Sequence, residues 1–251
     1  MTSAGQDTDA QGTAGEEAGP FAAYAGRWWD AEGPFQPLHA LNPLRLGYIR
    51  DALCGHFGRD PRSFQSLDGL RILDAGCGGG LLSEPMARLG AEVVGADAEE
   101  PNIRAARAHA EASGLAIDYV HARAEDMAEW GERFDTIPAM EVIEHVDDAA
   151  LFVAACGALL RPGGALVFAT LSRTMKAYAM AIIGAEYVLG WLPRGTHDWN
   201  KFLRPSDLAR SLRGNGFSLR DITGVAYDPL ERSWRARRDP SVNYMGFAVK
   251  R

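Results

Sequence analysis

The chain has 251 residues, which is enough for one large domain with a substantial core. Hydrophobic residues make up 47% of the chain and charged residues 24%, a composition that excludes a fibrous or wholly disordered protein. The net charge of −7 argues against the broad basic surface of a nucleic-acid-binding protein, and the three cysteines lack the paired spacing of a disulfide framework or a zinc knuckle.

Residues 1–20 are rich in Gly, Ala, Thr, Asp and Glu and contain neither Lys nor Arg. This composition predicts a disordered tail. It does not fit a signal or transit peptide, because those segments need positive charge near their start. No apolar run in the chain is long enough to span a bilayer. We therefore expect a single domain over residues 21–251, in a reducing cytoplasm.

Residues 21–68 predict an N-terminal helical arm before the first strand. Because Pro34, Pro37 and Pro43 interrupt it, we expect short helices that lie over the ligand cleft, held down by the aromatic side chains of the arm. Arg45 follows an Asn-Pro pair, and an arginine held by a turn can reach a carboxylate. The spacing leaves open whether Arg45 binds a ligand or is a solvated helix charge.

The stretch Arg71–Asp97 reads as a strand, a glycine-rich turn, a helix and a second strand that ends in an acid. Such a unit is half of a Rossmann-type fold, whose ligand lies above the carboxyl ends of the strands. Glycines suit the turn because a ligand must lie against bare backbone, and because such turns use φ angles that other residues avoid. Asp97, at the end of the second strand, is placed to accept hydrogen bonds from ribose hydroxyls.

The turn of this unit lacks the last glycine of the dinucleotide-binding fingerprint. Asp74, just before the turn, suits a cationic ligand better than a diphosphate. The pattern D-x-G-x-G-x-G followed by an acid-ended strand resembles motif I of class I methyltransferases, which bind S-adenosylmethionine. That resemblance implies that Gly76 and Gly78 lie along the methionine part of this cofactor and that Asp97 holds its ribose.

Alternating strands and helices continue along the chain and indicate an α/β protein of Rossmann-like class I methyltransferase fold, with a mainly parallel seven-stranded sheet and helices on both faces. The further expected strands are 117–120, 134–140, 165–169, 217–224 and 244–249, and the further expected helices are 99–114, 147–160 and 205–213. Pro138 is expected near the end of its strand, where the chain leaves the sheet. The methyltransferase resemblance implies that Ala124 and Glu125 lie near the adenine.

The segment that follows the fourth expected strand contains Glu141, Glu144 and His145. In a doubly wound sheet this point lies beside the first strand, at the mouth of the cleft. A helical turn would bring the two carboxylates and the imidazole onto one face. His145 could then be the general base for a phenol, whose pKa is about 10, or the three side chains could hold a divalent metal, most readily Mg²⁺. A structural role at the strand end is the third alternative.

Residues 171–205 interrupt the sheet order at a position where substrate-covering elements usually sit. Residues 177–192 are almost wholly apolar but too few to cross a membrane. They could form a helix that walls a substrate pocket and rests on a bilayer, or one that is buried against the sheet, and apolar content alone does not separate the two. Basic residues flank the run and favour an anionic membrane surface: Lys176, Arg194, Lys201 and Arg204. A second basic cluster near the C-terminus consists of Arg232, Arg235, Arg237 and Arg238.

Seven segments carry a more specific resemblance: RWWDAEGPFQPLHALNPLRLGYI, LDAGCGGGLLSEPMARLGAEVVGAD, MEVIEHV, SRTMKAY, GAEYVLGWLPRGTHDWNKF, VAYDPLERSW and VNYM. Together they resemble the ubiquinone biosynthesis O-methyltransferase family over nearly all of residues 21–251. The resemblance implies methylation of ring hydroxyls on polyprenylated catechol and quinol intermediates, of the 3-demethylubiquinol and 2-polyprenyl-6-hydroxyphenol type. It implies cofactor contacts at Arg45, Gly76, Asp97 and Met140, and divalent-metal ligands at Glu141, Glu144 and His145.

The same resemblance implies a protein that associates peripherally with the bacterial inner membrane, with a complex of ubiquinone-biosynthesis enzymes as a further partner and no nucleic acid. Three other functions stay open on the residues alone. One is an O-methyltransferase for another soluble phenol or catechol, and one is a cofactor-binding module without catalysis. The last is an NAD-dependent oxidoreductase, which the missing glycine disfavours.

Overall fold

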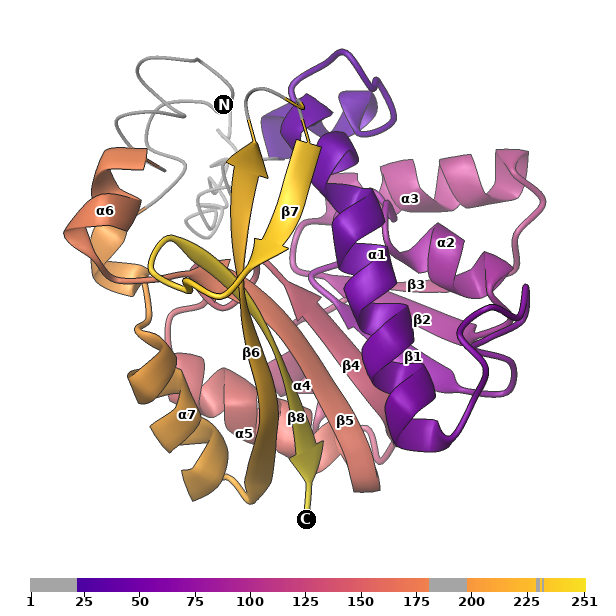
Figure 1. The fold of residues 1–251 in the computed structure, drawn as a ribbon. Helices are drawn as coiled ribbons and strands as arrows, with labels where there is room; N and C mark the ends of the chain where they lie inside the picture. The colour runs from indigo at the N-terminus through magenta and orange to yellow at the C-terminus, as the bar shows by residue number, and fades with distance from the viewer. Residues whose placement is uncertain (1–21, 181–197, 229–230, 232) are drawn as a thin grey trace, which may run out of the picture.

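The computed structural model describes residues 22–180, 198–228, 231 and 233–251 (Figure 1). Its strands form one eight-stranded sheet in the order β3-β2-β1-β4-β5-β8-β6-β7. The strands from β3 to β5 pair in parallel, and β8, β6 and β7 join them by antiparallel pairing. They are β1 (Arg71–Ala75), β2 (Glu92–Asp97), β3 (Asp118–His121), β4 (Phe134–Met140), β5 (Leu160–Leu171), β6 (Phe217–Asp228), β7 (Ser233–Arg237) and β8 (Asn243–Lys250). The predicted α/β class is confirmed. The predicted number of strands is wrong, because the described sheet contains the short strand β7 in addition to the seven that were predicted.

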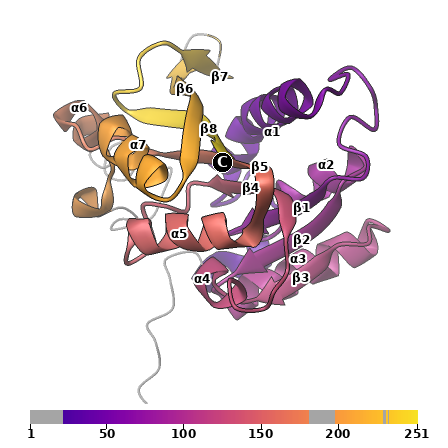
Figure 2. The ribbon, with the colours of Figure 1, turned by 90° about the horizontal axis from the view of Figure 1, so that it is seen from below.

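Helices cover both faces of the sheet (Figure 2). One face carries α1 (Gln36–Phe57), α2 (Ser83–Arg88) and α3 (Glu100–Ala112), and the other carries α4 (Ala124–Met127), α5 (Ala149–Leu159) and α7 (Pro205–Gly214). Neighbouring residues of each strand serve opposite faces, as the two-residue period of a strand requires. Ile72 and Val93 pack under α1 and α2, whereas Leu73 and Val94 pack against α5 and α7.

The N-terminal arm differs from its prediction, because its prolines do not divide it into short helices. A 3-10 helix, η1 (Ala22–Arg27), precedes the continuous helix α1, which contains Pro37 in its first turn and Pro43 in its interior. A proline in the first turn loses no helical hydrogen bond. Pro43 does lose one, but the buried face of α1 against the sheet, with Leu41, Ile49 and Leu53, holds the helix together around it.

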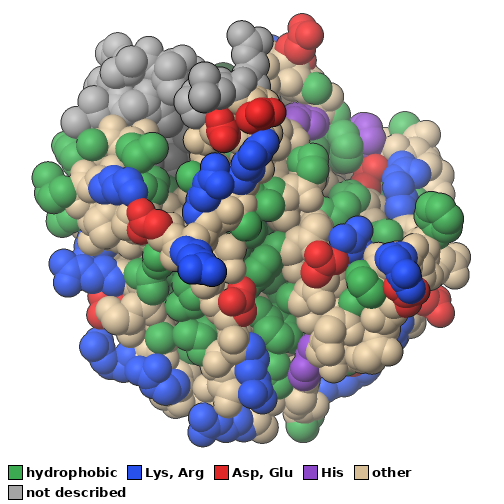
Figure 3. All heavy atoms as spheres, viewed as in Figure 1, with side chains coloured by type: hydrophobic (Ala, Val, Ile, Leu, Met, Phe, Trp, Pro, Cys, Tyr) green, Lys and Arg blue, Asp and Glu red, His purple; other side chains and the backbone are tan. Residues whose placement is uncertain are grey.

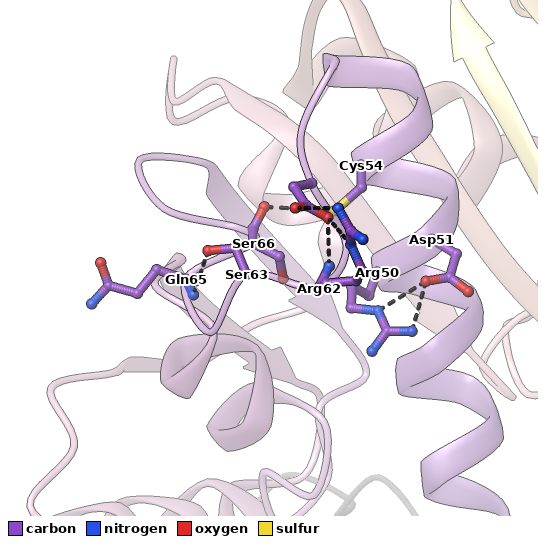
Figure 4. Close-up of polar contacts among 8 residues, drawn as sticks. Arg50, Asp51, Cys54, Arg62, Ser63, Gln65 and Ser66 are labelled. Carbon is purple, nitrogen blue, oxygen red and sulfur yellow. Dashed lines mark hydrogen bonds and ion pairs between the residues drawn. The ribbon is translucent and has the colours of Figure 1, made fainter.

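Helix α1 ends at Gly58, which adopts the left-handed conformation common at helix ends. Figure 4 shows the polar contacts near this end, where the buried Cys54 thiol points to the backbone oxygen of Ser66 at 3.7 Å. The contact ties α1 to the loop that leads into β1. Cys54 therefore belongs to the framework of the arm and not to the site described below.

The middle of the sheet shows two smaller differences from prediction. Pro138 lies near the end of β4, but the chain stays in the sheet, with Pro138 opposite Val167 and Met140 opposite Ala169 on β5. The β1 ladder reaches β4 only at Thr136, so the missing N–H of Pro138 falls beyond it. Strand β5 begins earlier than predicted because Leu160 already pairs with Phe134.

The predicted basic cluster lies partly on β7, which pairs with β6 in a hairpin. Each described arginine of this strand has an acidic neighbour: Arg235 lies 3.6 Å from Glu231, and Arg237 lies 3.5 Å from Asp228. The face seen in Figure 3 likewise shows Asp and Glu side chains between the Lys and Arg side chains. This part of the surface is therefore not a patch of a single charge.

The described ends of the 171–205 segment consist of the end of β5, the short helix α6 (Met175–Ala177) and the 3-10 helix η3 (Trp199–Lys201). Most of the predicted apolar run, from residue 181 to 192, lies outside the described residues, as does the predicted tail at residues 1–20. Within the part of the chain that is described, no helix combines the length and the apolar character needed to cross a membrane.

Candidate active site

The carboxyl ends of β1, β2 and β4 open into a cavity of about 1450 Å³. Open parallel sheets bind their ligands at this edge. Every residue singled out as a site candidate from the sequence lines this cavity: Arg45, Asp74, Gly76, Gly78, Asp97, Ala124, Glu125, Met140, Glu141, Glu144 and His145. The structure thus brings together residues that are almost a hundred positions apart in the chain, while their individual roles stay predictions.

The glycine turn after β1 leaves no room for side chains. Gly76 and Gly78 have φ angles of 71° and 53°, in the left-handed region that glycine tolerates best. A Cβ atom on Gly76 would lie 2.3 Å from Val142, and one on Gly78 would lie 2.6 Å from the Trp28 ring. The turn is therefore fitted between the segment after β4 and the N-terminal arm, with its backbone lining the cavity.

Asp97 is held in place by three hydrogen bonds. Its carboxylate accepts from the backbone N–H groups of Gly78 and Glu99, each at 2.9 Å, and from the Asn102 amide at 3.1 Å. Burial raises the pKa of Asp97, and these donors oppose that effect. Asn102 also accepts a hydrogen bond from the Trp28 indole at 2.9 Å. The arm, the turn and the acid thus form one connected unit.

Trp28 and Asn102 both line the cavity, and the sequence did not single them out as ligand-contacting residues. Trp28 stacks on Phe35 with ring centroids 3.7 Å apart, which confirms the predicted packing role of the arm's aromatic side chains. The signal for Asn102 was weak, because it is one polar residue in a helix rich in polar residues.

Asp74 is buried at the end of β1 and accepts a hydrogen bond from the Ser83 hydroxyl at 2.6 Å. Burial is the main reason why the pKa of Asp74 rises to about 6, and the nearby charge of Asp97 adds to the effect. The hydrogen bond from Ser83 and the charge of Arg45 act in the opposite direction. Two close carboxyl groups with raised pKa values make this end of the cavity favourable for a cationic ligand.

Arg45 is buried in α1, only 4% exposed, and pairs with Glu141. The predicted turn around Arg45 is wrong, because α1 continues through Pro43, but the alternative of a solvated helix charge is wrong as well. The Nε atom of Arg45 is buried and has no hydrogen-bond partner among the described residues. An arginine in this state can still take up a carboxylate.

Glu141 follows β4 in a conformation that is rare for a residue with a side chain, with a φ angle of 54°. Burial raises the pKa of Glu141 to about 7, against the opposing charge of Arg45, and Glu144 adds to the rise. The nearby Asn243 side chain acts in the same direction as Arg45 and lowers the pKa of Glu141. The left-handed backbone thus directs this carboxylate toward α1 on one side and β8 on the other.

The predicted helical face of Glu141, Glu144 and His145 is wrong, because the chain forms a tight turn here, closed by a hydrogen bond from His145 N to Val142 O at 2.8 Å. Glu144 is buried and accepts a hydrogen bond from the Thr170 hydroxyl at 2.8 Å. Burial, and then the charge of Lys201, lowers the pKa of His145 to about 4. His145 is therefore neutral at pH 7.

The predicted metal site is not formed in this arrangement. Among residues 22–180, 198–228, 231 and 233–251, no three His, Cys, Asp or Glu side chains are grouped closely enough to hold a metal ion. Glu141 is turned to Arg45 and Glu144 to Thr170, so the predicted ligands face different partners. The three residues share one cavity wall, but they do not fit a metal as they stand.

Comparison with known proteins identifies the family of the chain. Residues 73–168 match the model of the methyltransferase domain family. The ubiquinone biosynthesis O-methyltransferase of Mesorhizobium japonicum is 56% identical over 230 residues, covering 92% of each chain, and that of Rhizobium etli is 53% identical over 250 residues, covering 100% of this chain and 99% of the relative. The chain belongs to the ubiquinone biosynthesis O-methyltransferase family. The predicted resemblance, and with it the assignment as an S-adenosylmethionine-dependent O-methyltransferase, is confirmed.

Solved structures of more distant methyltransferases show the same fold as this family member. An S-adenosylmethionine-dependent methyltransferase from Thermotoga maritima matches with a TM-score of 0.62 at 15% identity, covering 92% of this chain and 98% of that one. Magnesium protoporphyrin IX methyltransferase from Synechocystis, with bound S-adenosylhomocysteine, matches with a TM-score of 0.57 at 23% identity, covering 82% and 83%. These similarities confirm the predicted class I fold.

Proposed function

We propose that the enzyme methylates a ring hydroxyl of polyprenylated catechol- or quinol-type intermediates in ubiquinone biosynthesis. The observation that carries this proposal is the single cavity in which the glycine turn, Asp97 and the segment Glu141–His145 meet. The names of the closely similar relatives support the ring substrate. The alternative function is methylation of another, soluble phenol. It would use the same cavity, but its substrate would lack the prenyl tail.

The cofactor end of the cavity lies at the glycine turn. Bound there, S-adenosylmethionine supplies an electrophilic methyl group on a sulfonium. Asp97 would hold the ribose, and Ala124 and Glu125 at the start of α4 would lie along the adenine. Arg45 would bind the carboxylate, which its unpartnered Nε supports. Asp74 and Met140, at the ends of β1 and β4, would flank the methionine part.

At the opposite side of this site, His145 would accept the proton of the ring hydroxyl during methyl transfer. A neutral imidazole can do so, and burial keeps His145 neutral at pH 7. The ring oxygen that gives up this proton ends as a neutral methyl ether, and the imidazolium that forms is adjacent in the chain to the buried carboxyl group of Glu144. Glu141 and Glu144 would fix the orientation of the groups around His145.

The divalent metal predicted at Glu141, Glu144 and His145 does not fit the arrangement of these side chains. It requires Glu141 to leave Arg45, and no step of the proposed proton transfer depends on it.

We also infer that residues 21–251 act as one methyltransferase domain and that residues 171–205 cover the substrate. The exposed apolar side chains of Met175, Tyr178 and Met180 support contact between this segment and a membrane surface, while Lys176 beside them is paired with Asp239 at 2.7 Å. Association with other enzymes of the pathway is a further proposal, carried by the family resemblance alone.

The decisive experiment measures methyl transfer from labelled S-adenosylmethionine to a prenylated catechol and to the same catechol without its prenyl chain, with and without anionic liposomes. We expect the prenylated ring to be preferred and the protein to sediment with the vesicles. Glu144→Gln should abolish turnover and leave S-adenosylhomocysteine affinity nearly unchanged. Equal activity on both rings would favour the soluble-phenol rival, and cofactor binding without transfer to any phenol would favour a non-catalytic module.

A further inference from the structure

Asn243 is a buried polar residue in the wall of the active-site cavity. It is the first residue of β8, only 7% exposed, and lies opposite Leu171 on β5 and Val225 on β6. Strand pairing on both sides fixes its backbone, so its side chain has little freedom to move away. Neither the cofactor turn nor the Glu144–His145 pair uses it.

The two ends of the Asn243 amide are in different states. The amide lies near Glu141 and favours the ionised form of that carboxyl group. Its Oδ1 atom is buried and has no hydrogen-bond partner among the described residues. Buried acceptors are nearly always satisfied, so an unpartnered one in a cavity wall indicates a ligand that brings a donor.

The surroundings define that donor. Apolar side chains stand on both neighbouring strands, Leu171 and Val225, and both line the same cavity. A ligand that fits here is therefore largely apolar with a single donor at the position of Oδ1. Because Glu141 and His145 line the same cavity as Asn243, and Glu141 is an electrostatic neighbour of Asn243, this donor lies on the side of the cavity that carries His145.

We propose that Asn243 Oδ1 accepts a hydrogen bond from the ring hydroxyl adjacent to the one that is methylated, which makes Asn243 a specificity-determining residue for rings with two neighbouring hydroxyls. The inference rests on the proposed function and names the feature of the substrate that the site reads. It also predicts that each ring is methylated only once at this pair of hydroxyls. A ring turned to present its second hydroxyl would place the new methoxy oxygen against Oδ1, and two acceptors repel each other.

The test compares a prenylated catechol with the prenylated monophenol that lacks the neighbouring hydroxyl. In the wild type we expect kcat/KM for the catechol to be at least about tenfold higher, and its affinity for the enzyme–S-adenosylhomocysteine complex to be higher by a similar factor. Asn243→Leu should reduce this preference to within about twofold while S-adenosylhomocysteine still binds. Asn243→Ala serves the same purpose if the leucine variant does not fold, and Asn215→Leu, in a residue at the end of α7 outside the cavity, is the matched control.

The ratio of the two substrates separates recognition from structure. If Asn243 only positions Glu141, the variants will lower activity on both rings equally and keep the preference, which would overturn the inference. Equal affinity of both rings for the wild-type complex would overturn it without any variant. A wild-type enzyme that transfers methyl groups to no prenylated phenol would instead refute the proposed function.

Discussion

Gly76→Ala tests whether the glycine turn and the segment after β4 are as tightly fitted as they look. The substitution adds a single methyl group at a φ angle of 71°, and that methyl group would lie 2.3 Å from one Val142 methyl and 3.2 Å from the other. Ordinary carbon contacts lie at about 3.5–4.0 Å. The backbone and Val142 must therefore both yield, or the turn must move.

The expected loss of stability follows from three contributions. A left-handed conformation costs a non-glycine residue roughly 1–2 kcal/mol. Overpacking of a well-filled site costs typically about 1–3 kcal/mol. The reduced freedom of the unfolded chain returns about 0.4–1 kcal/mol. We therefore expect Gly76→Ala to lower the free energy of unfolding by roughly 1–5 kcal/mol, and to weaken S-adenosylhomocysteine binding because Val142 adjoins Glu141.

Urea unfolding followed by tryptophan fluorescence measures this loss, provided that the m-value stays unchanged. Val142→Ala removes both clashing methyl groups, so the double variant should be more stable than the sum of the single changes by roughly 1–3 kcal/mol. Gly55→Ala, in α1 where a methyl group meets nothing within 4 Å, is the control and should be neutral or stabilising. A Gly76→Ala variant within about 0.5 kcal/mol of the wild type, which is the usual scatter of harmless substitutions, would show that the reasoning is wrong.

Three further predictions address the charged residues of the site. Asp97→Ala should raise the dissociation constant of S-adenosylhomocysteine at least about tenfold in calorimetry, because it removes the acceptor of three hydrogen bonds. The control Asp118→Ala, at the exposed first residue of β3, should leave this constant unchanged. Unchanged binding in both variants would remove Asp97 from the cofactor site. Asp74 has a folded-state pKa of about 6 against about 3.9 in the unfolded chain, so this residue lowers the free energy of unfolding by about 3 kcal/mol as the pH rises from about 4 to 6. Asp74→Asn should reduce this pH dependence in urea unfolding. The same pH dependence in the variant and the wild type would contradict the raised pKa of Asp74. Calorimetric titration of the ligand-free protein with Mg²⁺ should give the same weak heats for the wild type and Glu144→Gln, because the three predicted metal ligands face different partners. Tight Mg²⁺ binding by the wild type that Glu144→Gln abolishes would show that these residues do form a metal site.

The strand–turn–helix–strand unit that we propose binds the cofactor could be predicted because its geometry is local in the sequence. The backbone of a tight turn needs glycine, and the acid that it faces must end the next parallel strand, so the spacing from Gly76 to Asp97 is set by one strand–helix–strand unit. The structure keeps this unit as predicted, with Gly78 N donating directly to Asp97. Short-range geometry of this kind leaves a readable pattern.

The substrate half could be predicted only in part because its geometry is set by tertiary contacts. The i+3 and i+4 spacing of Glu144 and His145 from Glu141 fits a helix, but Glu141 adopts a left-handed conformation so that its carboxylate reaches Arg45. That partner lies on α1, far away in the chain, and no local pattern links the two. The same holds for β7, a short edge strand with mostly exposed residues, which pairs with β6 and packs Trp234 against the core beneath α1.

The position of Glu141 links the proposed cofactor half of the site to the proposed substrate half, which contains Asn243. The Glu141 carboxylate pairs with Arg45, which we propose binds the cofactor carboxylate, and lies near Asn243, which we propose binds the ring. A cofactor carboxylate that binds Arg45 would compete with Glu141 for the same guanidinium, and Asn243 would then be the neighbour that keeps Glu141 in place. Buried charges with a removed partner are strongly destabilised, so this second contact makes the exchange feasible without leaving Glu141 uncompensated. Cofactor binding would then release Glu141 from Arg45 before the ring binds. The ring should therefore bind the cofactor-free enzyme more weakly than it binds the enzyme–cofactor complex.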